Sequence, residues 1–217
     1  MNKPVIAIDG FSSTGKSSIS KIIAKRLGIV HLDTGALYRG ITWFALQNCI
    51  NDEQKIDLEE LFASFHLIEL EFRNDEGELV LYLNHINVSK EIRTKEVADH
   101  VSFIAKQKEV RDFLLSTQRS LAMKGGIIMD GRDIGTVVLP NADYKFFLTA
   151  SIDERSRRRY MEMVCLGMTT DLETVKENLI TRDKIDSERE IAPLKKAEDA
   201  TEIDNTFMNK EETIEKI

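Results

Sequence analysis

The sequence predicts an α/β fold in which helices flank a parallel sheet and a small antiparallel insert interrupts the alternation. One observation behind this prediction is a glycine-rich stretch between a short apolar strand and a helix, reading Gly10-Phe11-Ser12-Ser13-Thr14-Gly15-Lys16-Ser17. A second is the alternation of short apolar runs with apolar residues at helical spacing. A third is a period of two within residues 65–89, which is typical of antiparallel strands. Alternating strands and helices favour a parallel sheet that is covered on both faces.

The glycine-rich stretch has the spacing G-x-x-x-x-G-K-[ST] of a phosphate-binding loop. Glycine allows the backbone to curl until several N–H groups face one anion, and the N-terminus of the next helix adds partial positive charge. In this pattern Lys16 reaches the outer phosphates and the Ser17 hydroxyl helps to hold Mg²⁺. The alternative is a chance match in an ordinary glycine turn, which the flanking strand and helix disfavour.

Composition narrows the class of protein. The chain has 217 residues, of which 42% are hydrophobic and 31% charged, as in a soluble globular protein with a sizeable core. The net charge of −7 argues against a nucleic-acid-binding coat or an anionic membrane surface as partner. Cys49 and Cys165 suggest no disulfide framework, so we expect a cytoplasmic protein. The N-terminal apolar run ends at Asp9, which argues against a signal peptide or a membrane span.

The first half of the chain contains the insert. The helix after the loop is predicted to end at Gly28, and a strand over 29–33 leads into a helix capped by Asp33 or Thr34. Asp57 is predicted to cap a short helix. The insert follows, with strands over 68–73, 79–83 and 86–88 and a turn over 74–77.

The second half returns to alternation. We expect helices over 95–105 and 108–123, from Asp153, and over 171–187, and strands over 127–130, 144–148 and 202–204. In parallel sheets ligands bind at the carboxyl ends of the strands. Asp130-Gly131-Arg132-Asp133 follows one such strand, and Asp33-Thr34 follows another. The first segment could be a solvated loop and the second a simple helix cap, but the position of each beside the phosphate loop favours a role in binding charge.

Two charged helices follow. On the first, one face carries Arg155, Arg158 and Arg159. Like charges at this spacing repel each other, so we expect them to meet their partner, an anion such as phosphate, only when nucleotide is bound. The alternative is a solvated face. On the second helix, spacings of three and four relate Arg182, Asp183, Asp186 and Arg189, for which an intrahelical ladder of ion pairs is the alternative.

Other chemistries find little support in the sequence. The four histidines show no metal-ligand spacing, and the two cysteines form no CxxC pair, so a zinc site is not expected. The sequence also lacks the Gly-x-Ser-x-Gly pattern of a nucleophilic serine.

Several motifs together resemble the bacterial cytidylate kinases, a family of P-loop nucleoside monophosphate kinases. In order along nearly the whole chain they are the phosphate loop, Leu32-Asp33-Thr34-Gly35-Ala36-Leu37-Tyr38-Arg39, Glu91-Ile92-Arg93-Thr94, Asp130-Gly131-Arg132-Asp133-Ile134-Gly135-Thr136 and Ile191-Ala192-Pro193-Leu194. The resemblance implies a P-loop NTPase-type fold in one domain. Its core would span 1–64, 90–150 and 190–217, with a monophosphate-binding β insert at 65–89 and a helical lid at 153–189.

The resemblance also assigns residues to sites. It implies an ATP site formed by Gly10, Phe11, Ser12, Ser13, Thr14, Gly15, Lys16, Ser17 and Ser18. It implies catalytic roles for Lys16, Arg132, Arg155 and Arg158, the last two in the lid. Mg²⁺ would be held by Ser17 through ATP and by Asp130 through water.

The implied CMP site draws on residues from several segments. Arg39, Arg132 and Arg189 would contact the acceptor phosphate, and Arg182 with Asp186 the ribose side. Ser102, Arg111 and Asp133 would face the cytosine. The site is completed by Thr34 and Tyr38.

The implied activity is the phosphorylation of CMP and dCMP by ATP, with Mg²⁺, by a cytoplasmic monomer that binds neither nucleic acid nor membrane. One alternative is a P-loop kinase for another monophosphate or small acceptor. Another is a nucleotide-dependent switch, which would need the guanine-reading pattern Asn/Thr-Lys-x-Asp, and the sequence contains no such tetrapeptide.

Overall fold

The structure is a computed structural model that describes residues 3–75 and 78–217. The chain divides into two compact units. The first comprises Met1–Leu32 and Ala122–Ile217, and the second comprises Asp33–Leu121.

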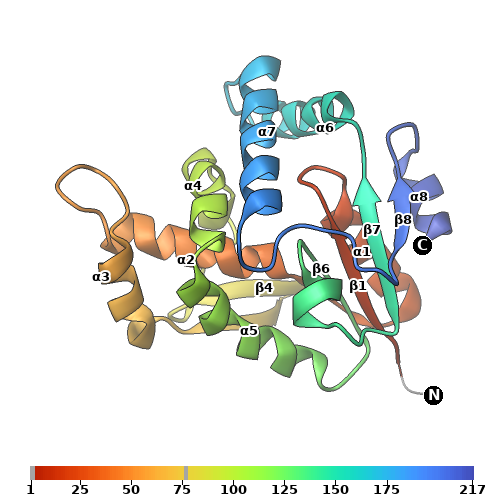
Figure 1. Cartoon of the computed structure of the whole chain (residues 1–217), viewed down its shortest axis with the longest axis horizontal. Helices are drawn as coiled ribbons and strands as arrows, with labels where there is room; N and C mark the ends of the chain where they lie inside the picture. Colours follow the sequence, from red (N-terminus) through yellow and green to blue (C-terminus); the bar gives the residue numbers. More distant parts are fainter. Residues whose placement is uncertain (1–2, 76–77) are drawn as a thin grey trace. The chain divides into compact units, whose positions relative to one another are not determined.

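The first unit is built on a five-stranded sheet of order β2-β6-β1-β7-β8. Its strands are β1 (Val5–Gly10), β2 (Val30–Asp33), β6 (Ile127–Gly131), β7 (Tyr144–Thr149) and β8 (Thr201–Asp204). Figure 1 labels four of these strands, β6, β1, β7 and β8. β1 pairs in parallel with both β6 and β7, and β7 pairs in parallel with β8. The segments that follow these strands therefore leave the sheet at one edge, where ligands bind in such folds.

The α-helices described in this unit are α1 (Lys16–Leu27), α6 (Ile152–Cys165), α7 (Leu172–Glu188) and α8 (Lys210–Lys216). Helices α1 and α8 pack on the sheet through an apolar cluster that includes Ile8, Ile23 and Ile214. Helices α6 and α7 lie side by side (Figure 1), joined by a small cluster of Met163, Val175 and Leu179. A π-helical turn, η3 (Ile134–Val138), follows β6.

The second unit packs helices and the antiparallel insert around one apolar core. Its elements are α2 (Thr34–Asn48), α3 (Leu58–Ala63), η1 (Ser64–Leu67), β3 (Leu70–Asp75), β4 (Glu78–Leu83), β5 (Ile86–Asn87), η2 (Glu91–Arg93), α4 (Lys95–Ala105) and α5 (Lys108–Ala122). The three strands pair antiparallel in the order β3-β4-β5. Leu37, Leu61 and Ile104 are fully buried in the core.

The predicted fold class is confirmed. The glycine cap at Gly28 and the Asp57 cap of α3 are also confirmed, since Gly28 has a φ of 62° and the Asp57 side chain accepts from the N–H of Glu60. The predicted turn over 74–77 includes Glu76 and Gly77, which lie outside the described residues. Within residues 3–75 and 78–217, no helix is both long and apolar enough to cross a membrane.

Candidate active site

The phosphate loop joins β1 to α1 in a tight curve. The backbone φ is +147° at Gly10 and +91° at Gly15, a region that glycine enters without steric cost. A Cβ atom on Gly10 would lie 2.1 Å from the carbonyl oxygen of Leu148, so this position requires glycine. Lys16 is buried, and its Nζ donates a hydrogen bond of 2.6 Å to the carbonyl oxygen of Phe11. The lysine amine therefore folds back across the loop.

The hydroxyl of Ser17 lies against the carboxylate of Asp130. Ser17 Oγ donates to Asp130 Oδ2 at 2.6 Å. Ile8 of β1 is the register partner of Asp130 in β6, which brings this carboxylate to the edge of the sheet from which the phosphate loop leaves. Mg²⁺ takes oxygen ligands and is usually bound by one or two protein groups together with water and phosphate. The donor set of Ser17 and Asp130 fits this ion, so these two residues would hold it.

Asp9 anchors the segment that follows β6. Its carboxylate is buried and accepts hydrogen bonds from the backbone N–H groups of Ile134 at 2.8 Å and Gly135 at 2.7 Å. Burial raises the pKa of the Asp9 carboxyl to about 7, although both hydrogen bonds act in the opposite direction. Because η3 begins at Ile134, Asp9 fixes the end of the Asp-Gly-Arg-Asp segment.

Arg132 connects the phosphate loop with α7. Its Nε donates to Asp186 Oδ2 at 3.0 Å, and its Nη2 donates to Ser12 Oγ at 2.7 Å. Burial disfavours the charged form of the Asp186 carboxyl, but the surrounding positive charges, foremost Arg132, outweigh burial and hold its pKa below the usual value. The structure thus brings together three residues that the sequence assigned to the ATP and CMP sites.

Asp133 and Arg189 extend this cluster. Arg189 Nη2 donates to Asp133 Oδ1 at 3.4 Å, and Arg189 Nη1 lies 3.9 Å from Asp186 Oδ1. Both partners of the first pair are buried. Arg182, one turn before Asp186 on α7, adds to the positive charge that lowers the pKa of Asp186. The ladder proposed as an alternative for α7 is therefore only part of the arrangement, because α7 also pairs with the segment after β6.

Arg155 of α6 is buried between α7 and the phosphate loop. Its Nη1 donates to Asp183 Oδ2 at 2.5 Å and to the carbonyl oxygen of Ser12 at 3.3 Å. Its guanidinium also lies 5.1 Å from the ring centre of Phe11. The expectation that this arginine meets its partner only with bound nucleotide is wrong, because Asp183 already balances its charge. The alternative of a solvated face is wrong for Arg155 as well.

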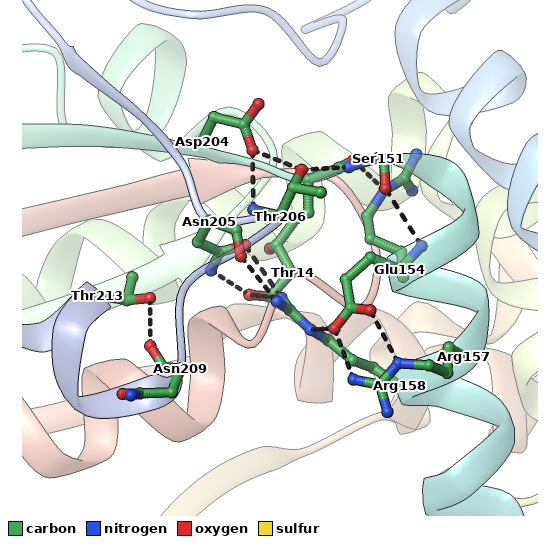
Figure 2. Close-up of polar contacts among 12 residues, drawn as sticks. Thr14, Ser151, Glu154, Arg157, Arg158, Asp204, Asn205, Thr206, Asn209 and Thr213 are labelled. Carbon is green, nitrogen blue, oxygen red and sulfur yellow. Dashed lines mark hydrogen bonds and ion pairs between the residues drawn. The ribbon is translucent and has the colours of Figure 1, made fainter.

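Figure 2 shows Arg158 of α6 reaching the segment after β8. Arg158 donates to Asn205 Oδ1 at 3.0 Å and to the Asn205 carbonyl oxygen at 2.8 Å. Asn205 Nδ2 in turn donates to the Thr14 carbonyl oxygen of the phosphate loop at 2.8 Å. Glu154 accepts from Arg157 and Arg158, and these hydrogen bonds, foremost that of Arg157, lower the pKa of its carboxyl to about 2. The expectation that Arg158 meets its partner only with bound nucleotide is therefore also wrong, because Glu154 and Asn205 already accept hydrogen bonds from it.

Neither Asn205 nor His31 had a role predicted from the sequence, and Asp9 was named only as the end of the N-terminal apolar run. Asn205 is buried and follows β8 at the carboxyl edge of the sheet. The rule that ligands bind at this edge could have identified it, because polar residues directly follow a predicted strand there. His31 and Asp9 gave no comparable signal, since their partners lie about a hundred residues away in the chain.

The second unit holds the remaining candidates. Arg39 Nη2 donates to Asp33 Oδ2 at 2.7 Å. Asp33 is the N-cap residue of α2 but makes no side-chain capping bond, so helix capping does not explain this side chain. Arg111 is buried, with its guanidinium 5.3 Å from the ring centre of Tyr38 and its Nη1 3.1 Å from the Ala105 carbonyl oxygen. Two further candidates, Thr34 on α2 and Ser102 on α4, are buried.

A protein catalyses phosphoryl transfer mainly by positioning charges around the transferred group. A parallel sheet with a glycine loop, a lysine at the start of the next helix and a serine beside a strand-end aspartate does this in P-loop kinases. The fold and the loop define the chain as a nucleotide-binding phosphotransferase of this class. The chain belongs to the cytidylate kinase family, whose sequence profile matches residues 6–217.

Curated relatives agree with this assignment over the length of the chain. A cytidylate kinase of Geobacillus sp. (strain WCH70) is 48% identical over 98% of this chain and 93% of its own length. A cytidylate kinase of Bacillus thuringiensis (strain Al Hakam) is 47% identical with the same coverage. Among solved structures, a shikimate kinase from Bacteroides thetaiotaomicron is 10% identical, covers 98% of this chain and 95% of its own, and has a TM-score of 0.48, a level that adds nothing to the assignment.

Proposed function

We propose that this protein transfers the γ-phosphoryl group of ATP to CMP and dCMP, giving ADP and CDP or dCDP. The observation that carries the proposal is the attachment of the Asp130–Asp133 segment to the phosphate loop, through Ser17 on one side and Arg132 on the other, in a chain of the cytidylate kinase family. A phosphate oxygen of CMP would attack the γ-phosphorus of ATP. The bond between the γ-phosphorus and the oxygen that bridges to the β-phosphate would break, and ADP would leave with that oxygen.

At the ATP end, the work of the protein is electrostatic. The N–H groups of residues 10–18 would bind the phosphates, and the Lys16 amine would exchange the Phe11 carbonyl for a phosphate oxygen. Mg²⁺, held by Ser17 and Asp130, would supply positive charge to the β- and γ-phosphates when bound. Arg155 and Arg158 already touch the loop backbone, so they support its curve as well as adding charge.

At the acceptor end, we propose that Arg39, Arg132 and Arg189 bind the CMP phosphate and that Arg182 and Asp186 face the ribose. Ser102, Arg111 and Asp133 would read the cytosine, and Thr34 and Tyr38 would complete the site. Arginine suits the phosphate role because its planar fork matches two oxygens at once. A carboxylate that accepts from the exocyclic amine of cytosine would reject uracil, which has a carbonyl at that position.

The lid over 153–189, the insert over 65–89 and the remaining core are proposed as one catalytic domain. Closure of this domain over the bound nucleotides would exclude water, which would otherwise hydrolyse ATP. The monomeric state and the cytoplasmic location remain predictions, and light scattering of the purified protein tests the first.

The test is the release of ADP from ATP and Mg²⁺ with a panel of acceptors: CMP, dCMP, UMP, AMP and GMP. We expect CMP and dCMP to be used with the highest kcat/KM. A higher kcat/KM with another monophosphate would support the alternative kinase, and acceptor-independent hydrolysis alone would contradict the proposal.

A further inference from the structure

Among the histidines of the described residues, His31 is the one whose hydrogen bond lies next to the phosphate loop, at Asp130. It lies on β2, which neighbours β6 in the sheet. Its Nε2 is 2.6 Å from Asp130 Oδ1, while the other oxygen of the same carboxylate accepts from Ser17. The Asp130 side chain is 3% exposed and that of His31 is 17% exposed. The two oxygens of the Asp130 carboxylate therefore contact different partners, His31 at Oδ1 and Ser17 at Oδ2.

This arrangement has a physical consequence for Asp130. A carboxylate that is held at one oxygen only can rotate about its Cβ–Cγ bond, because that torsion is soft. With His31 on Oδ1 and Ser17 on Oδ2, both oxygens have fixed directions. The groups that hydrogen-bond to metal-binding carboxylates orient them in this way, and their loss typically lowers metal affinity by about 10–100-fold.

We propose that His31 is a positioning residue that orients Asp130 toward Ser17 and so raises the affinity of the protein for the magnesium complex of the nucleotide over that for nucleotide alone. The inference rests on the proposed function in one respect, the placement of Mg²⁺ at Ser17 and Asp130. A merely structural tie between β2 and β6 would instead affect both forms of the nucleotide equally, through the fold.

The experiment compares His31→Phe, which keeps a ring but removes the hydrogen bond, with His31→Gln, whose amide can reach Asp130 as a donor. Titration calorimetry measures the Kd of ADP with excess Mg²⁺ and with EDTA. For His31→Phe we expect the Kd of Mg·ADP to rise about tenfold, the Kd of metal-free ADP to change less than about twofold, and His31→Gln to restore most of the difference. His66→Phe, at an exposed histidine of the second unit, is the matched control.

A double-mutant cycle isolates the pair. Once Asp130 is replaced in Asp130→Asn, adding His31→Phe should raise the Kd of Mg·ADP no further. Equal losses with and without Mg²⁺, or an undiminished effect of His31→Phe in the Asp130→Asn background, would overturn the inference. If His31→Phe does not fold, His31→Asn, which is too short to reach Asp130, serves the same comparison. Wild-type protein that shows neither magnesium-dependent ADP binding nor CMP-dependent ADP release would instead overturn the proposed function.

Discussion

The two compact units differ in what they bury. The first unit buries charged side chains at the carboxyl edge of its sheet, including Lys16, Asp130, Asp133, Arg155, Asp186 and Arg189. In the second unit, Arg111 is the one charged side chain that is buried among the described residues, and the core around it is apolar. Buried charge is costly unless it is paired. The first unit therefore needs a partner for each buried charge, and a site that binds charged ligands is a reason to keep so many charged groups at this edge.

The pairing within the first unit shows how this cost is limited. Arg155 faces Asp183, Arg132 faces Asp186, and Lys16 faces a backbone carbonyl. Under the proposed function, a phosphate that enters this site would exchange these partners rather than meet unpaired charges. The comparison predicts that a substitution in the first unit will lower stability where it breaks a buried ion pair, and will lower catalysis where it removes positive charge beside the phosphate loop.

The largest effect is expected for Arg155→Ala. This change leaves Asp183 without its closest cation, and breaking a buried pair typically costs about 3–5 kcal/mol. Urea unfolding should show this loss, together with a lower kcat. Arg157→Ala on the same helix is the control, because Arg157 is exposed and pairs only with Glu154 in the contacts described, and exposed pairs contribute about 0–1 kcal/mol. Equal unfolding free energies for the two variants would contradict the burial argument.

Lys16→Ala should affect catalysis more than stability. Loss of a charged group at developing negative charge costs about 2.7–4 kcal/mol, or two to three decades in kcat. The expected melting temperature is close to that of the wild type, because the lost hydrogen bond is to a single carbonyl oxygen. Lys25→Ala, an exposed position near the end of α1, should leave kcat unchanged. Near-normal turnover in a folded Lys16→Ala protein would remove the phosphate loop from the mechanism.

How far the sequence could predict this structure depends on the range of the interactions. The phosphate loop, the Gly28 cap and helix α4 were predictable because each is specified by residues within a few positions. The turn η3 was not predictable, because its sequence Ile-Gly-Thr-Val-Val is typical of a strand. Hydrogen bonds to the Asp9 carboxylate of β1 fix the start of this turn instead. The partner of Arg155 was also missed, since Asp183 lies on the next helix. Local signals identified the parts of the site, but not how they pair.

A smaller effect is expected on the pH dependence of folding stability, through the carboxyl group of Asp9. The pKa of its carboxyl is about 7 in the folded protein, above the ordinary 3.8, so between these values the folded state holds a proton that the unfolded state has lost. Its contribution to stability is therefore present at low pH and declines as pH rises through 7, by about 1.4 kcal/mol between pH ~6 and ~8. Asp9→Asn should lack this decline in urea unfolding at the two pH values. The same pH dependence in both proteins would assign it to other groups.

The central claim is that the first unit reads the acceptor base through Asp133. The most direct measurement is kcat/KM for CMP and for UMP with the wild type and with Asp133→Asn, which keeps an oxygen that can accept from Arg189 but adds a donor. We predict that the ratio of CMP to UMP use falls at least about tenfold, or ~1.4 kcal/mol, in the variant. An unchanged ratio with uniformly lower activity would show that Asp133 serves only its ion pair with Arg189 and would contradict the claim.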